Sequence, residues 1–382
     1  MSPLWFPQGE YEARLEALRV RLDERGLDGL LLTWDANIRY YTGFRQIVAD
    51  SMLTRPSAAI LPRVGEPVLF VHQFLAGDAV PSVWFPDVRR YMQLDGPPVA
   101  EIAAELRSRG LRRLGAELGL EQRLGMPYRD FTTLRGALSE TAWVDAADLI
   151  WHQRARKSPA ELECLRQAGS ATARAYEAVL PQVAPGMSER EVARLLSRAM
   201  IDSGADEVGF ILMTSGEGNY GRISGLPTDR RLARGDMLWV DMGARVNDYW
   251  ADFSRAGVIG GATDQQKRMQ ATVAAVTAKG IARAAPGVPV SEIVQACNEE
   301  IKRRGHDITF VAGRIGHGLG LNITEHPHVA TYDLTVLEPG MVITVEPGIV
   351  EPYGVFHIEE NLIITDRGSE VISSAGRELW TI

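Results

Sequence analysis

Residues 237–257 read MLWVDMGARVNDYWADFSRAG, a stretch whose alternating apolar and polar side chains predict a β-hairpin. If the two-residue turn is Val246-Asn247, Asp241 lies directly opposite Asp252 on the neighbouring strand. Opposed residues share one face of a sheet, with Cβ atoms roughly 5 Å apart. Two carboxylates ~4 Å apart repel by about 4 kcal/mol at an effective dielectric constant of ~20. The pair therefore predicts a cation between the two strands.

A second hairpin is predicted over residues 341–365, MVITVEPGIVEPYGVFHIEENLIIT. Its turn, EPYG at residues 351–354, has proline in second place and glycine in fourth, as type I turns do. A turn centred there places Glu346 opposite Glu359. An isolated acid pair is commonly only solvated, so the argument depends on two hairpins each placing acids in register.

The segment between the hairpins contains RIGHGLGLNITEHPHV at residues 314–329. Here His317 stands among glycines, which let a backbone approach a ligand closely. Four carboxylates and one imidazole suit divalent manganese, cobalt, iron or zinc. Two ions ~3.5–4 Å apart need bridging carboxylates, which two facing acid pairs can supply. The sequence therefore predicts a site for two divalent metal ions.

These motifs, in this order, resemble those of the pita-bread metallopeptidase superfamily, which includes methionine aminopeptidase, prolidase, aminopeptidase P and creatinase. The resemblance is carried by VDMG (240–243), ADFSR (251–255), GHGLGL (316–321), LEPGMVITVEPG (337–348) and HIEEN (357–361). In addition, RLDERGLDGLLLTWDANIRYYTGF (21–44) resembles the creatinase-type N-terminal domain, and RKSPAELECLRQA (156–168) resembles the helix that opens the catalytic domain.

The resemblance implies an α+β chain of two domains. Residues 1–155 would form the smaller α/β creatinase-type domain. Residues 156–382 would form the catalytic domain, a curved antiparallel sheet with flanking helices and internal pseudo-two-fold symmetry. The residues at the junction agree, because Ser158-Pro159 followed by Glu161 is a typical helix start.

The resemblance also assigns roles to the candidate ligands. Asp241 would ligate the first metal, and His317 and Glu346 the second, while Asp252 and Glu359 bridge both. Manganese is the expected metal, with cobalt, zinc or iron as alternatives. The implied activity is that of an Xaa-Pro aminopeptidase or dipeptidase using a metal-bridging hydroxide. The resemblance also gives a catalytic role to three of these residues, Glu346, His317 and Glu359. Of these, Glu346 would carry the proton to the leaving nitrogen. Homodimers are common in this superfamily.

Two histidines that orient substrate in such peptidases are missing from the expected positions. Ser224 or Gly225 occupies the first position and Thr324 the second. His326 or His328 could supply the missing imidazole if the loop is rearranged, and the alternative is a polar rim residue.

Three further positions bear on substrate recognition. His357 stands where many relatives have arginine. Tyr220 and Arg222, beside a glycine-rich turn, are candidate substrate-pocket residues, with a solvated loop as the equally weighted alternative. The substrate is therefore a small peptide or, alternatively, a small metabolite. Under the small-metabolite hypothesis the chain is a catabolic hydrolase or lyase, similar to ectoine hydrolase or dimethylsulfoniopropionate lyase.

Composition excludes several other classes. The chain has 382 residues, 45% hydrophobic and 24% charged, which fits two globular domains. A net charge of −8 argues against a nucleic-acid binder. Membrane spans are not expected, since no window approaches the ~20 apolar residues needed. Two cysteines cannot build a disulfide framework, and the N-terminus lacks a signal peptide, so a cytoplasmic protein is expected.

Overall fold

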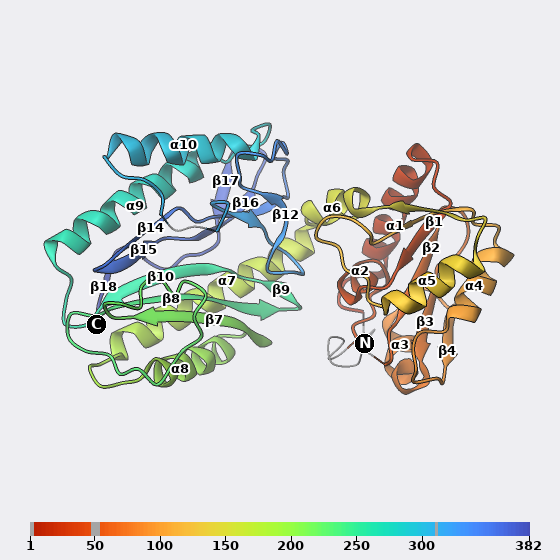
Figure 1. Cartoon of the computed structure of the whole chain (residues 1–382), viewed down its shortest axis with the longest axis horizontal. Helices are drawn as coiled ribbons and strands as arrows, with labels where there is room; N and C mark the ends of the chain where they lie inside the picture. Colours follow the sequence, from red (N-terminus) through yellow and green to blue (C-terminus); the bar gives the residue numbers. More distant parts are fainter. Residues whose placement is uncertain (1–3, 47–53, 310–311) are drawn as a thin grey trace. The chain divides into compact units, whose positions relative to one another are not determined.

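A computed structural model describes residues 4–46, 54–309 and 312–382 (Figure 1). The chain forms two compact units, Met1–Gln153 and Arg154–Ile382. Over the described residues, no helix combines the length and apolar character needed to cross a membrane.

The N-terminal unit is built on a mixed six-stranded sheet in the order β4-β3-β2-β1-β5-β6. Its strands are β1 (Gly29–Leu32), β2 (Ala58–Pro62), β3 (Val68–His72), β4 (Val88–Tyr91), β5 (Arg113–Ala116) and β6 (Ala142–Asp145). Its helices are α1 (Gln8–Glu24), α2 (Asp35–Thr42), α3 (Ala76–Ser82), α4 (Val99–Ser108) and α5 (Tyr128–Ala137), with the 3-10 turn η2 (Gln73–Leu75). Strands β2 and β3 pair antiparallel around the Gly-Glu-Pro turn at residues 65–67. Helix α6 (Ala147–Ala155) leads into the second unit.

Two helices of the C-terminal unit begin where their capping residues predict. Helix α7 (Pro159–Val179) starts after Ser158, whose side chain accepts from the Glu161 N–H while the Glu161 carboxylate accepts from Ser158 N. Helix α8 (Glu189–Asp202) starts with the same reciprocal pair, Ser188 and Glu191. Such capping satisfies N–H groups that have no partner inside the helix. The turn η3 (Leu180–Gln182) lies between them.

The strands of this unit form two main sheets. The first contains β7 (Glu207–Ser215), β8 (Met237–Val246), β9 (Tyr249–Trp250), β10 (Phe253–Val258) and β18 (Trp380–Thr381). The second contains β11 (His317–Gly318), β12 (Glu325–His328), β13 (Val342–Val345), β16 (Glu360–Ile364) and β17 (Ser369–Val371). A separate hairpin is made by β14 (Gly348–Glu351) and β15 (Gly354–His357).

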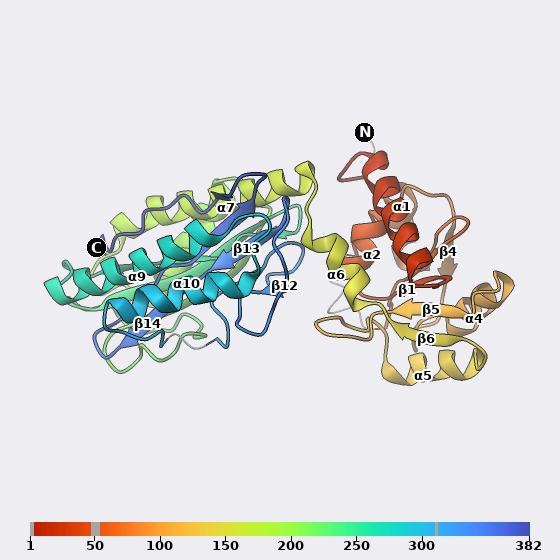
Figure 2. The same ribbon diagram turned by 90° about the horizontal axis from the view of Figure 1, so that it is seen from above.

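The helices are arranged as two pairs. Helices α9 (Asp264–Arg283) and α10 (Val290–Arg303) lie side by side in both views and cover the opposite side of the strands from α7 and α8 (Figures 1 and 2). The segments before α8 and α10 read APGMS (184–188) and APGVP (285–289), and each ends in an isolated bridge, Ser188 to Arg231 and Pro289 to Val336. This repetition agrees with the internal pseudo-two-fold symmetry that the sequence resemblance implies.

Strand β8 lies between the two hydrophobic cores. Its even-numbered residues, from Leu238 to Ala244, belong to the core under α7 and α8. Its odd-numbered Met237 and Trp239 belong to the core under α9 and α10. Because side chains alternate along a strand, Asp241 faces the same side as Trp239, toward the second sheet.

Candidate metal centre

The first predicted hairpin forms, but with a different register. Asn247 and Asp248 make the turn, with φ of 51° and 64°. Arg245 therefore pairs with Trp250, and Asp241 pairs with Ser254 rather than Asp252. The predicted Val246-Asn247 turn is wrong because a two-residue turn of this type needs positive φ at both central residues, which Asn and Asp adopt more readily than a β-branched residue.

Asp252 reaches the centre from a break in the strand. It lies between β9 and β10, where Asn361 holds its backbone from both sides. The Asp252 N–H donates to Asn361 Oδ1 at 3.0 Å, and Asn361 Nδ2 donates to the Asp252 carbonyl. Ala256 and Val258 on β10 belong to the core under α9 and α10, so the even-numbered Asp252 faces the same side as Asp241.

The second hairpin has the predicted register. Gly348 pairs with His357, and Val345 pairs with Glu360 on the strands that continue it. Glu346 and Glu359 fall between these pairs, in the short breaks separating β13 from β14 and β15 from β16. Both side chains are buried.

Glycines hold His317 close to the neighbouring strands. A Cβ on Gly316 would lie 2.1 Å from the Thr344 carbonyl oxygen, and one on Gly318 would lie 2.4 Å from the His326 carbonyl oxygen. The His317 ring places Nδ1 2.9 Å from the Gly318 carbonyl oxygen, so Nδ1 carries the proton. Nε2, the nitrogen left with a lone pair, lies 3.4 Å from Asp252 Oδ2 and 3.7 Å from Glu346 Oε1.

The four carboxylates repel one another. Burial, together with neighbouring Asp252 and Glu346, raises the pKa of Asp241 well above its ordinary value. Burial and the other three acids likewise raise the pKa of Glu359. Burial also raises the pKa of Asp252, against the opposing effect of His317. Burial alone would raise the pKa of Glu346 too, but nearby imidazoles lower it below its usual value.

These residues fit divalent cations. Asp252, His317 and Glu359 bring one ligand atom each within 4.8 Å of one another, and so do Glu346, His357 and Glu359. Asp241 Oδ1 is buried and has no hydrogen-bond partner among the residues that the structure describes. A buried charged oxygen without a partner is costly, and a metal ion would satisfy it.

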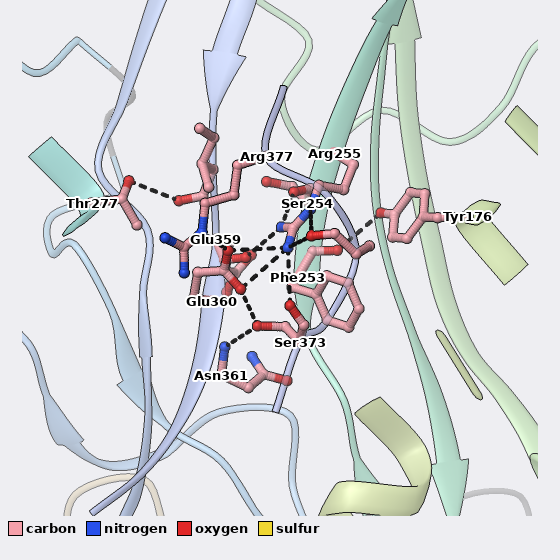
Figure 3. A network of polar contacts seen from close by, with 12 residues as sticks. Tyr176, Phe253, Ser254, Arg255, Thr277, Glu359, Glu360, Asn361, Ser373 and Arg377 are labelled. Carbon is pink, nitrogen blue, oxygen red and sulfur yellow. Dashed lines mark hydrogen bonds and ion pairs between the residues drawn. The ribbon is translucent and has the colours of Figure 1, made fainter. Parts of the chain in front are cut away.

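A buried arginine joins the two hairpins behind this cluster (Figure 3). Arg255 on β10 donates to the carbonyl oxygen of Glu359 at 2.9 Å and forms an ion pair with Glu360 at 3.0 Å. Ser373 and Arg377 also donate to the Glu360 carboxylate. On β8 and β10, the Tyr176 hydroxyl lies 3.0 Å from the Val240 carbonyl oxygen and 2.9 Å from that of Phe253. The backbone around the acids is therefore fixed by buried polar contacts.

Sequence profiles identify both parts of the chain. The profile of metallopeptidase family M24 matches residues 163–366, and that of the creatinase/prolidase N-terminal domain matches residues 14–156. The chain belongs to metallopeptidase family M24. It is 29% identical to the peptidase YqhT of Bacillus subtilis and 27% identical to the Xaa-Pro dipeptidase of Pyrococcus furiosus, each over 96% of this chain and 99% of the relative. The solved Xaa-Pro dipeptidase from Bacillus anthracis is 26% identical and superimposes with a TM-score of 0.84, over 97% of this chain and 100% of that one.

On one side of the M24 centre lies a half-buried arginine that the sequence reasoning missed. Arg314 Nη1 is 3.0 Å from His328 Nδ1, and Nη2 donates to Thr324 Oγ1 at 3.2 Å. Burial would raise the pKa of Glu346, and the charge of Arg314 helps to lower it, after the larger effects of His357 and His317. His328 pairs directly with His317 across β11 and β12, and Arg314 contacts both His328 and Thr324. That His328 supplies the missing imidazole stays a prediction. Arg314 stands three residues before the predicted ligand His317, and this spacing is the sequence signal that could have identified it.

The structure places the other predicted substrate-binding residues in different environments. Tyr220 is a core residue whose hydroxyl accepts from Met237 N at 3.0 Å, and its contact with substrate stays a prediction. His326 contacts the 333–335 loop, with Nε2 3.0 Å from Thr335 Oγ1. Arg222 and Ser224 are exposed. Within the described parts of the chain, neither has a side-chain bond to the acid cluster, so their contact with substrate stays a prediction.

Glu325, the acid that follows the missing histidine, anchors the loop between β11 and β12. It is buried between Arg154 and Lys157, which both donate to its carboxylate. Burial would raise the pKa of Glu325, but the two cations lower it below the ordinary value. The Asn322 N–H donates to it as well, at 3.1 Å. This ion cluster holds the segment that carries Thr324 and His328 in place.

Proposed function

We propose that this chain is a two-metal Xaa-Pro dipeptidase. In this proposal a nucleophile derived from water attacks the peptide bond of a dipeptide that ends in proline. The observation that carries the proposal is the convergence of Asp241, Asp252, His317, Glu346 and Glu359, with Asp241 Oδ1 buried and without a hydrogen-bond partner. Two relatives named Xaa-Pro dipeptidase match nearly the whole chain, which supports this substrate class over methionine aminopeptidase substrates.

The donor set indicates how two ions would be held. Asp241 would ligate one, His317 and Glu346 the other, and Asp252 and Glu359 would bridge them. Bound there, divalent ions would lower the pKa of water toward about 7 and stabilise charge that develops on the peptide carbonyl. Mixed carboxylate and imidazole ligands suit manganese, which we propose as the metal. A homodimer in solution is part of the same proposal.

Glu346 is the residue best placed to move a proton. Its pKa lies below the ordinary value, so it is ionised near neutral pH and can accept a proton from the attacking water. The same carboxyl group would then protonate the leaving proline nitrogen. His317 Nε2 lies 3.7 Å from Glu346 Oε1 and limits the orientations open to this carboxylate.

Arg314 supports a preference for a dipeptide over a longer peptide. Its guanidinium group is half-buried and its charge reaches both His317 and Glu346. A guanidinium group binds a carboxylate through two parallel hydrogen bonds, so Arg314 is placed to receive the free carboxylate of a C-terminal proline. An amidated dipeptide lacks that charge, and an extended peptide carries it at least one residue beyond the proline.

The test is hydrolysis by manganese-loaded protein of Ala-Pro, its C-terminal amide and Ala-Pro-Ala. We expect Ala-Pro to be cleaved fastest, and chelator to abolish the activity. Arg314→Gln should raise KM for Ala-Pro about 10–100-fold, as loss of a charge-assisted hydrogen bond implies. It should leave the amide unaffected. Arg303→Gln, an exposed arginine on α10, is the control. Equal cleavage of dipeptide and amide would contradict the dipeptidase assignment. Failure to cleave any proline peptide with any divalent metal would favour the small-metabolite alternative.

A further inference from the structure

His357 is a fully buried imidazole that the five predicted ligands do not account for. It is the last residue of β15, two positions before Glu359, and it pairs with Gly348 across the hairpin. Its ring packs against Trp239, with the two ring centroids 5.8 Å apart. The ring is therefore held rigidly between the first sheet and the segment that carries Glu346.

The contacts of the two ring nitrogens define the direction of the hydrogen bonds. His357 Nε2 lies 3.1 Å from the carbonyl oxygen of Glu346, which can only accept, so Nε2 carries the hydrogen. Nδ1 lies 2.8 Å from Ser254 Oγ, whose hydroxyl group can donate to it. A ring that carries its hydrogen on Nε2 and accepts at Nδ1 satisfies both contacts.

The same Nε2 also faces the carboxylate of Glu346. Its distance to Oε2 is 3.6 Å, while Oε1 on the other side lies 3.7 Å from His317 Nε2 and 3.5 Å from Thr344 Oγ1. His357 therefore contacts the backbone of Glu346 and lies beside one of its two carboxylate oxygens. Because both its backbone and its carboxylate are in contact with His357, Glu346 loses little conformational freedom when its carboxylate points at a substrate.

We propose that His357 is a positioning residue, which fixes Glu346 through its Nε2–H and is itself oriented by Ser254. This inference rests on the proposed function, in which Glu346 moves the proton. It differs from direct metal binding, because an Nε2 that donates to a carbonyl group has no lone pair for a metal ion. An arginine at this position could not accept a hydrogen bond from Ser254, so the pair Ser254–His357 depends on the imidazole.

Two amide variants separate the contributions of the ring nitrogens. In His357→Gln, the amide nitrogen can occupy the place of Nε2 and donate to Glu346. In His357→Asn, the shorter amide can reach Ser254 but not Glu346. Partners behind a metal site typically contribute 10–100-fold to activity or metal affinity. We expect His357→Asn to lower kcat for Ala-Pro about 10–100-fold with little change in KM, and His357→Gln to retain most of the wild-type kcat.

The matched control is His72 in the N-terminal unit. It is also buried, accepts from Phe74 N through Nδ1 at 3.1 Å and places Nε2 3.2 Å from the Met92 carbonyl oxygen. His72→Asn should lower the melting temperature about as much as His357→Asn does, yet leave kcat unchanged. This comparison separates positioning from a general loss of stability.

Cobalt-loaded protein gives a readout that does not depend on turnover. We expect the visible spectrum of Co²⁺ in His357→Gln to match wild type, and that in His357→Asn to change because the Glu346 carboxylate is reoriented. If both variants lose one equivalent of bound cobalt, His357 is a metal ligand and the positioning inference is overturned. It is also overturned if kcat and spectrum are unchanged in His357→Asn. If wild-type protein binds no cobalt or manganese, the proposed function itself fails, and that result is distinct from the other two.

Discussion

The two hairpins contribute acids to the same centre but support them in different ways. On the first hairpin, Asp241 has an oxygen without a hydrogen-bond partner, and its pKa is raised by burial and by its acidic neighbours. On the second, Glu346 lies beside two imidazoles that lower its pKa against the effect of burial. The first hairpin therefore depends on a cation to hold its charge, whereas the second holds Glu346 ionised with protein groups.

The largest expected effect comes from replacing Glu346 on the second hairpin, which tests this contrast. Glu346→Gln keeps the shape of the side chain but removes its ability to carry a proton. General acid–base catalysis contributes about 10²–10⁴-fold, so we expect kcat for Ala-Pro to fall by that factor. Glu351→Gln, in the turn of the same hairpin, is the control and should leave kcat unchanged. Wild-type turnover by Glu346→Gln would show that another group moves the proton.

The next largest effect is expected from replacing Arg255, which joins the two hairpins. Arg255→Met leaves Glu360 as a buried charge without its principal partner and removes the donor to the Glu359 carbonyl oxygen. Breaking a buried ion pair from one side destabilises by about 3–5 kcal/mol, and we expect that loss in urea unfolding of the metal-free protein. The double variant Arg255→Met/Glu360→Leu should be less destabilised than Arg255→Met alone. If the double variant is the less stable of the two, the burial of an unpaired charge is not the cause.

Asp241 on the first hairpin and Glu346 on the second should respond to pH with opposite signs when no metal is bound. The folded-state pKa of Asp241 is raised, so its contribution is fully present below about 3.9 and is lost as pH rises through the raised value. The folded-state pKa of Glu346 is lowered, so its contribution is present above about 4.3 and is lost as pH falls through the lowered value.

Asp241→Asn should therefore stabilise the metal-free protein at pH 7 by on the order of 1–2 kcal/mol, and Glu346→Gln should not. Melting curves in chelator between pH 4 and 8 give the measurement. With manganese present the order should reverse for Asp241→Asn, because the ligand for the ion is lost. A metal-free Asp241→Asn that melts below wild type throughout this range would show that Asp241 is held by protein contacts rather than by a cation.

The sequence predicted the second hairpin better than the first for a local reason. Proline and glycine in residues 351–354 admit one turn position, so the Glu346–Glu359 register followed. Residues 246–248 contain both Asn and Asp, so two positions were possible, and the turn was placed one residue too early. Asp241 and Asp252 still face the same side, because the register error shifted the pairing by two residues and preserved the alternation of side chains.

The supporting contacts could not be predicted because they join segments far apart in the chain. Asn361 holds the Asp252 backbone across 109 positions, and Ser254 meets His357 across 103. No local spacing rule connects such residues. Similarly, Tyr220 lies beside a glycine turn in sequence, but the fold places its hydroxyl under Met237 N in the core.

The smallest effect tests the register of the first hairpin itself. In the observed register Asp248 is the second turn residue, with φ of 64°, and in the predicted register it would be a strand residue. Asp248→Gly and Asp248→Ala both lose the ion pair with Arg245, so their difference reports only on the backbone. Glycine adopts positive φ without strain, so we expect Asp248→Gly to be more stable than Asp248→Ala by about 0.5–1 kcal/mol. In a strand the order reverses, because glycine there is less stable than alanine by roughly 0.5–1 kcal/mol. Urea unfolding of the two variants at one pH decides between the registers by the sign of the difference alone.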